Sequence, residues 1–219
     1  MRLLARFTQG ELRLGRIEAF SDGVFAIIVT LLVLDLKVPV LNNPADVGEL
    51  WQGLIAQLPR FLSWLISFII VCKFWLNHHH VLGMARHADY SMVWINSIFL
   101  MGQSFIPFPT ALIGQYSENA LAVSIFGLVF ALNTVLFIAL QSYIQHRLLK
   151  PELVEQQDPN LFAKSFIGVA SYLAGAAMAW LSIPVAFVIY LITPFYFITP
   201  PGGRSRPVPG NEARCRDEL

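Results

Sequence analysis

The chain has 219 residues, of which 56% are hydrophobic and only 13% are charged, and its mean hydropathy is strongly positive. A soluble domain has about 25% charged residues, so this composition excludes an ordinary soluble protein and indicates an integral membrane protein with little mass outside the bilayer. The formal net charge of +1 says nothing about partners, and we expect membrane lipid around the chain and no nucleic acid.

The first hydrophobic segment is the most informative part of the sequence. Residues 23–34 carry no charge and lie between two carboxylates, Asp22 and Asp35. Twelve helical residues span about 18 Å, whereas a helix that faces lipid needs about 20 apolar residues. Carboxylates at membrane depth tend to mark cavities or ion paths. We therefore expect a helix over about 20–37 inside a bundle, with water at each end, as the wall of a pore.

Ser21 and Asp22 stand at the predicted start of this helix. Either side chain can accept hydrogen bonds from free amides and so cap the helix, and the carboxylate of Asp22 also complements the positive end of the helix dipole. The sequence therefore predicts an N-terminal cap at these two residues. Asp22 points away from the helix face that carries Ile27, which also suits it to a hydrogen bond between helices.

One face of the predicted helix carries a narrow stripe of apolar and small residues. At 100° per residue, this stripe lies within 60° of Ile27 and consists of Gly23, Ile27, Thr30, Leu31 and Leu34. Other faces are predicted to pack against the remaining helices through Phe25, Ile28 and Leu32. The same spacing also occurs in ordinary helix packing, so it leaves open whether the stripe lines a pore or packs.

Five further spans are predicted after the first. Runs with little or no charge cover about 55–77, 90–113 and 119–145, and Pro107 and Pro109 break the second of these runs near its end. After Lys164 no charge occurs until Arg204. A single helix of that length would be roughly 58 Å, about twice the hydrocarbon core. Because proline cannot continue a helix, Pro184 is predicted to divide this run into two short spans.

The predicted fold class is thus an all-α membrane protein with six transmembrane helices per subunit. Twelve Lys and Arg residues fall on the side of the two termini, against only Lys37 and Arg60 on the other side. The positive-inside rule then predicts that both termini are cytoplasmic, in the plasma or inner membrane. Residues 1–199 form the predicted channel domain. The proline- and glycine-rich residues 200–219 are predicted to be a disordered cytoplasmic tail.

The second span carries a buried cation and a run of histidines near its end. Lys73 either snorkels to the interface or pairs with a carboxylate. His78, His79 and His80 diverge by 100° per residue, so they cannot all face one ion, and we predict no metal site. A structural role and titration near neutral pH both remain open for them. No nucleophile–base pair lies at membrane depth, so we expect no catalytic residue and no enzyme.

Arg16, Phe20, Ser21 and Asp22 form the pattern Arg-x-x-x-Phe-Ser-Asp, followed by Gly-Val-Phe-Ala-Ile and Thr-Leu-Leu-Val-Leu. This pattern resembles the signature of the endolysosomal potassium channel family called transmembrane protein 175, in its prokaryotic form. The resemblance implies a cation channel without the Thr-Val-Gly-Tyr-Gly carbonyl filter, which is also absent here. It further implies a homotetramer in which the first helices of the subunits together line the pore.

The resemblance also implies roles for individual residues. Ile27 would form the narrowest point of the pore, Leu31 and Leu34 would follow further out, and Thr30 would form a threonine layer linked to potassium preference. Arg16, Phe20, Ser21 and Asp22 would form an interhelical network near the cytoplasmic mouth. Polar residues of the second and third spans are its candidate partners, namely Asn77, His78, His79, His80 and Asn96, of which we predict His79 and Asn96.

The sequence thus predicts a potassium-permeable cation channel that needs no cofactor and has a hydrophobic constriction, a device that gates by dewetting. A proton-leak channel of the same architecture is the alternative. A secondary transporter is a second alternative, although it would need a midplane site, often with broken helices. The first span has neither a Gly-Pro break nor a midplane acid. A membrane scaffold without transport is the remaining possibility.

Overall fold

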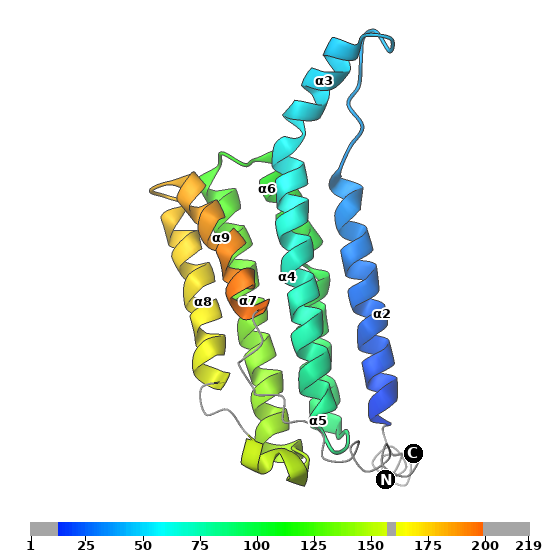
Figure 1. Ribbon diagram of the computed structural model, residues 1–219, viewed down its shortest axis with the longest axis vertical. Coiled ribbons are helices and arrows are strands. Elements are labelled where there is room, and N and C mark those ends of the chain that lie inside the picture. The colour runs from blue at the N-terminus through cyan, green and yellow to red at the C-terminus, as the bar shows by residue number, and fades with distance from the viewer. Residues whose placement is uncertain (1–12, 157–160, 199–219) are drawn as a thin grey trace, which may run out of the picture.

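The computed structural model describes residues 13–156 and 161–198, without the side chains of 154–165 and 195–198. Within this part of the chain every element of regular secondary structure longer than an isolated bridge is a helix. The helices run side by side as a bundle (Figure 1). The helices are α2 (Leu14–Leu32), α3 (Val47–Ala56), α4 (Leu58–Gly83), α5 (Tyr90–Ser104), α6 (Pro107–Gln115), α7 (Ala120–Tyr143), α8 (Leu161–Met178) and α9 (Ile183–Ile198). Short helical turns follow α2 and α7, namely η1 (Val33–Asp35), η2 (Ile144–Leu148) and η3 (Pro151–Gln156).

Four helical segments are long and apolar enough to cross a membrane. They cover Leu14–Asp35, Leu58–Gly83, Tyr90–Gln115 and Ala120–Leu148. Two shorter apolar helices, α8 and α9, follow them. The all-α membrane class is therefore confirmed, while the count of six spans per subunit stays a prediction.

The predicted cap of the first helix is wrong, because α2 begins at Leu14 and not near Phe20. Leu14 packs against the core, and the helix therefore begins more than one turn before the apolar run. Ser21 consequently lies inside the helix, where its hydroxyl donates to the carbonyl of Ile17 at 2.8 Å. Asp22, at the next position, is likewise free to act between helices.

Prolines start helices in this fold more than they end them. Pro107 is the first residue of α6, and the interruption falls just before it, at Phe105 and Ile106. Proline is tolerated in a first turn because its missing N–H has no partner there. The same holds for Pro184, the second residue of α9, which follows a break at 179–182. The predicted division of the last apolar run is confirmed, a few residues earlier than the proline itself.

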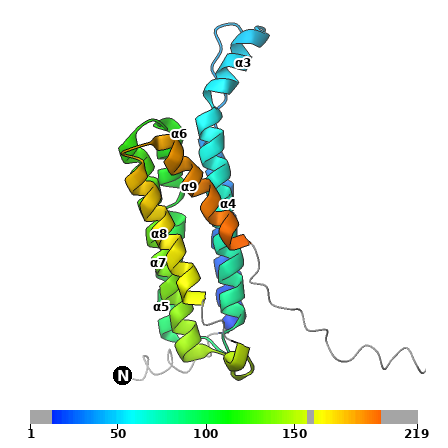
Figure 2. The ribbon, with the colours of Figure 1, turned by 60° about the vertical axis from the view of Figure 1, so that its left-hand side comes forward.

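Helix α3 was not predicted from the sequence. Asp46 caps it by accepting hydrogen bonds from the amides of Gly48 and Glu49. The carboxylate of Glu49 in turn accepts the amides of Asn42 and Asn43 at 2.8 and 3.0 Å. In two views, α3 stands beyond the end of all the other helices, as a continuation of α4 (Figures 1 and 2).

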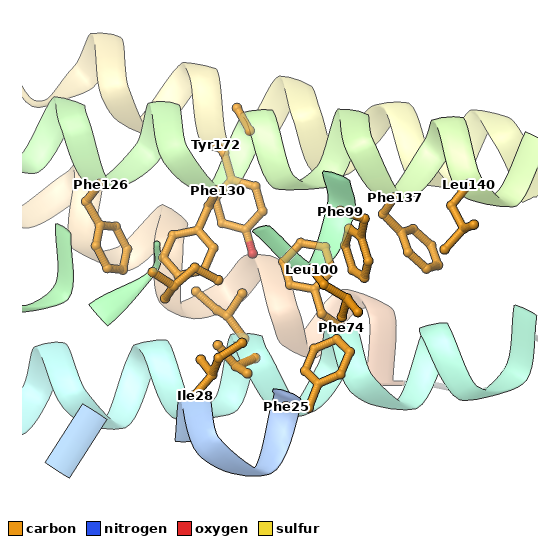
Figure 3. Packing of buried hydrophobic residues seen from close by; sticks show 14 of the residues in the cluster. Phe25, Ile28, Phe74, Phe99, Leu100, Phe126, Phe130, Phe137, Leu140 and Tyr172 are labelled. Atoms are coloured by element: carbon orange, nitrogen blue, oxygen red, sulfur yellow. The ribbon is translucent and has the colours of Figure 1, made fainter. Parts of the chain in front are cut away.

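Aromatic rings run through the core between the helices, among aliphatic side chains such as Ile28 and Leu100 (Figure 3). Phe25 of α2 meets Phe99 of α5 with ring centroids 6.1 Å apart, and Phe99 meets both Phe74 of α4 and Phe137 of α7. Such ring pairs add about 0.5–1.5 kcal/mol beyond the burial of their area. These contacts fix α2 against α4 and α5, which determines the face of α2 that stays outside the core.

Candidate pore helix and its polar anchor

Helix α2 has one buried and one exposed apolar face. Phe25, Ile28 and Leu32 are each at most 2% exposed, which confirms the prediction that they pack against the other helices. Ile27 and Leu34 are 59% and 70% exposed. Leu31 and Thr30 are exposed beside them. The four residues predicted to line the pore therefore share a continuous face that no described part of the same subunit covers.

Thr30 places the only hydroxyl on this face. Its Oγ1 lies 3.0 Å from the carbonyl of Ala26 and 2.9 Å from that of Ile27, one turn back along the helix. The hydroxyl hydrogen is thereby used within the helix, which leaves the oxygen lone pairs free. An oxygen in this arrangement can accept a hydrogen bond or a cation.

A buried hydrogen-bonded chain anchors the N-terminal half of α2 to the bundle. The side-chain amide of Asn96, on α5, donates to the hydroxyl oxygen of Ser21 at 3.0 Å. The other end of that amide, Oδ1, lies 2.7 Å from Nε2 of His78 on α4. All three side chains are at most 2% exposed. Because Oδ1 can only accept, Nε2 of His78 carries a hydrogen.

A second contact joins α2 to α4 at the adjacent residue. The indole N–H of Trp75 donates to the carboxylate of Asp22 at 2.8 Å. His79 lies one turn further along α4 and stacks on the Trp75 ring, with centroids 6.2 Å apart. The expected hydrogen bond of Asp22 between helices is thus present, with a tryptophan as its donor.

The structure therefore brings Ser21 and Asn96 together, while Asp22 bonds separately to Trp75, and it places a different histidine beside Asn96. His78, and not His79, is the histidine that bonds to Asn96, because the α5 side of α4 buries His78 and leaves His79 exposed. Arg16 and Phe20 are both exposed, so neither is part of the buried chain.

Lys73 lies on the inner side of α4. Its ammonium group is 4.8 Å from the centre of the Phe74 ring, and the side chain is only 7% exposed. A cation held over an aromatic face is attracted by the ring quadrupole. Of the two alternatives that the sequence leaves open for Lys73, this burial favours a place inside the bundle over snorkelling to the interface.

Basic residues gather at one end of the bundle. The bridge between Ala85 and Leu149 places the α4–α5 turn against the end of η2, and the amide of Lys150 donates to Met84. The start of α2 lies at the same end (Figure 1). Arg13, Arg16, Arg86, Arg147 and Lys150 all belong to these segments. Arg60 lies at the start of α4, at the opposite end (Figure 1).

No group of three or more His, Cys, Asp or Glu side chains that could hold a metal ion occurs in the described part of the chain. His78 is buried while His79 and His80 are exposed, so the run of histidines diverges as the helical geometry requires.

Comparisons with known proteins point to one family, and one relative matches almost the whole chain. The family model described as "Endosomal/lysosomal potassium channel TMEM175" matches residues 16–107. A protein of Streptomyces collinus named as a potassium channel is 31% identical over 205 residues, which cover 91% of this chain and 96% of that protein. The human protein named "Endosomal/lysosomal proton channel TMEM175" is 42% identical over 90 residues, which cover 39% of this chain and 18% of that protein.

A solved structure has the same fold. It is the crystal structure of a lysosomal potassium-selective channel TMEM175 homolog from Chamaesiphon minutus, with a TM-score of 0.74 and 30% identity, and the match covers 84% of this chain and 95% of that chain. The family is one of ion channels and not of enzymes. From its sequence, its fold and these near full-length matches, the chain belongs to the TMEM175 family of cation channels.

Proposed function

We propose that this chain forms a homotetrameric, potassium-permeable channel whose pore is lined by the exposed face of α2. The observation that carries this proposal is the division of α2 into a buried face and a bare apolar stripe. Of the 18 most apolar consecutive residues in Leu14–Asp35, only 22% are buried, against 56% of those in Ala120–Leu148. One stripe per subunit cannot enclose a pore, whereas symmetric copies around an axis can.

In this proposal Ile27 forms the constriction, and Leu31 and Leu34 continue the apolar wall. An apolar constriction passes ions only when it is wetted, so its widening opens the channel. Thr30, with its free lone pairs, is the polar layer beside the constriction. The permeant ion is K⁺, as the names of the Streptomyces and Chamaesiphon relatives suggest.

The proposed setting is the plasma or inner membrane, with both termini in the cytoplasm. The basic end of the bundle, which includes Arg86, Arg147 and the start of α2, supports this orientation through the positive-inside rule. Residues 1–199 are the proposed channel domain. The proposed cytoplasmic tail, 200–219, lies outside the described residues.

A proton channel of the same architecture is the second candidate, and the name of the human relative favours it. The two candidates differ in the ion that carries the current. In vesicles with equal potassium on both sides and valinomycin to carry the compensating charge, a pH gradient that collapses through the protein would support the proton channel. A pH gradient that persists there, with protein that still releases potassium down a potassium gradient when valinomycin is absent, would support the potassium channel.

The proposal is tested by potassium efflux from vesicles that contain the purified protein. We expect Ile27→Asn to raise the efflux, because a polar side chain lowers the cost of wetting the constriction. Val33→Asn is the matched control, since Val33 is also exposed but lies 120° away from Ile27 around the helix. Equal efflux from the parent and Ile27→Asn would contradict the assignment of the gate, and a saturable electroneutral flux would indicate a transporter.

A further inference from the structure

Helix α3 presents a bare apolar stripe beyond the start of α4, a helix that is itself long enough to cross a membrane. Together α3 and α4 run from Val47 to Gly83, about 55 Å of helix, whereas a bilayer with its headgroups is about 40–45 Å thick. Helix α4 alone is long enough to cross the membrane. Because α3 continues beyond α4 (Figures 1 and 2), a bilayer that α4 crosses would leave α3 outside its hydrocarbon.

The exposed apolar side chains of α3 and of the first residue of α4 recur with helical spacing. Val47 is 81% exposed and Trp51 63%, and Leu54, Ile55 and Leu58 are each between 39% and 51% exposed. At 100° per residue these five fall within 60° of Trp51. This set is called the α3 stripe below.

The linker from α2 covers part of the other side of α3, at Gly53 and Glu49. Gly53 lies opposite Trp51, and a methyl group there would meet the ring of Pro39 at 2.7 Å. Glu49, on the same side, binds the loop at Asn42 and Asn43. The linker from α2 therefore packs on the polar face of α3 and leaves the α3 stripe without cover from the described part of the subunit.

The stripe does not stop at the end of α3. It continues down the membrane-spanning helix α4 through Leu58, Phe61, Leu65 and Phe68, each at least 37% exposed. Together with Val47, Trp51, Leu54 and Ile55 it makes one strip of eight apolar side chains, each at least 37% exposed. A partner that covers the whole surface must pass from the aqueous phase into the bilayer.

We propose that the α3 stripe packs against a neighbouring copy of this chain in the assembled channel. A second copy meets the requirement, because it is itself embedded in the membrane and carries the same projecting helix. The linker 36–46 joins α3 directly to the outer end of the α2 stripe, so copies arranged around an α2-lined pore bring their α3 helices around the same axis. This inference rests on the proposed oligomeric channel and adds an interface outside the membrane.

Cysteine accessibility tests the interface. In a Cys72→Ser, Cys215→Ser background, Trp51→Cys and Val47→Cys are compared with Ala56→Cys, which is exposed on the same helix but about 140° from Trp51. In the intact oligomer we expect a membrane-impermeant maleimide to label positions 51 and 47 at least about tenfold more slowly than position 56, because an interface core excludes water. After the subunits are separated, the three rates should become equal.

Fast labelling at 51 and 47 in an intact oligomer would overturn the interface and leave the channel proposal standing. Equally slow labelling in separated subunits would also overturn it, since cover would then come from the same subunit or from detergent. A purified protein that is monomeric would contradict the proposed channel itself, so the two failures are distinct. A second pair, Trp51→Glu against Ala56→Glu, should weaken the oligomer only in the first variant, and equal weakening would contradict the proposal.

Discussion

Asn96 is the residue on which the position of α2 depends most directly. Its amide donates to Ser21 and accepts from His78, so one side chain satisfies polar groups of two other helices. In a buried site each such group is costly when it has no partner. Asn96 therefore determines how the N-terminal half of α2 sits against α4 and α5.

Replacing Asn96 by Leu should leave the Nε2 hydrogen of His78 buried without its acceptor and the Ser21 hydroxyl with only its bond to Ile17. We expect a loss of about 1–3 kcal/mol of stability, seen as a lower midpoint of thermal unfolding in detergent. Ser97→Ala is the control, because the Ser97 hydroxyl bonds only to the carbonyl of Val93 in its own helix. A loss no larger than that of the control would contradict the anchoring role.

Two variants of the contact between Trp75 and Asp22 distinguish the role of its hydrogen bond from the role of the Asp22 charge. Trp75→Phe keeps an aromatic ring for His79 to stack on but removes the indole donor, whereas Asp22→Asn keeps an acceptor and removes the charge. We expect Asp22→Asn to lose assembly or conduction, measured by oligomer mass and ion flux. Wild-type assembly and flux in this variant would restrict Asp22 to a minor structural role.

Glu49 links the linker to α3 in a pH-dependent way. The backbone amides of Asn42 and Asn43 hold the pKa of its carboxyl below the usual value. A group with a lowered folded-state pKa stabilises the fold above its unfolded pKa and loses that contribution as the pH falls through the folded value. Exchange of the Asn42 and Asn43 amides should therefore lose protection below about pH 4. Glu49→Gln should lack this step, and an identical profile in the variant would contradict the assignment.

At the scale of elements, small residues allow α7, α8 and α9 to approach one another. Gly127 of α7 and Gly175 of α8 both lie against the ring of Tyr190, on α9. The Tyr190 hydroxyl donates to the carbonyl of Val123 at 3.0 Å. A methyl group at either glycine would overlap with this ring, so the three helices depend on glycine at both positions.

Gly127→Ala should lower the unfolding midpoint, because overpacking of a tight core costs about 1–3 kcal/mol. Gly83→Ala is the matched control, since a methyl group there meets nothing within 4 Å. Alanine is the better helix former, by about 1 kcal/mol, so the control should be neutral or stabilising. Equal midpoints for the two variants would contradict the close packing around Tyr190.

The sequence predicted elements well where they form long uncharged runs and poorly where they do not. The spans from Tyr90 and from Asn119 begin where the sequence places them, because caps and charges mark their ends. Helix α3 escaped prediction because it is short and lies outside the apolar runs, although Asp46 and Glu49 have the spacing of a capping box. The start of α2 was also misplaced, since its first turn is charged and is helical through packing of Leu14.

The polar anchor shows a similar limit at the level of the site. Ser21, Asp22 and Asn96 could be proposed from the sequence. The helical period of 100° per residue also placed Ile27 on the exposed face and Ile28 on the buried face correctly. The choice between His78 and His79 could not be made, because it depends on the side of α4 that faces α5. That orientation follows from the contacts of Phe74 and Phe99, which only the folded bundle determines.

For the whole molecule, the exposed face of α2 is the feature that a single subunit leaves unexplained. The same helix is held firmly on its other side by Phe25 and by the Ser21–Asn96–His78 chain. A helix that is fixed on one side and bare on the other suits a pore wall, which must keep its position while the ion path stays open. The α3 stripe is a second apolar surface that one subunit leaves uncovered, and in the proposed assembly a neighbouring copy covers it outside the membrane.

The most direct test of this account is the ionic current of the purified protein in a planar bilayer, with potassium on one side and sodium on the other. If α2 lines a potassium pathway, the current has a reversal potential shifted toward that of potassium. Ile27→Asn should increase this current, Thr30→Ala should reduce the shift, and Val33→Asn should change neither. No current, or a reversal potential that none of the α2 variants alters, would contradict a potassium pathway along α2.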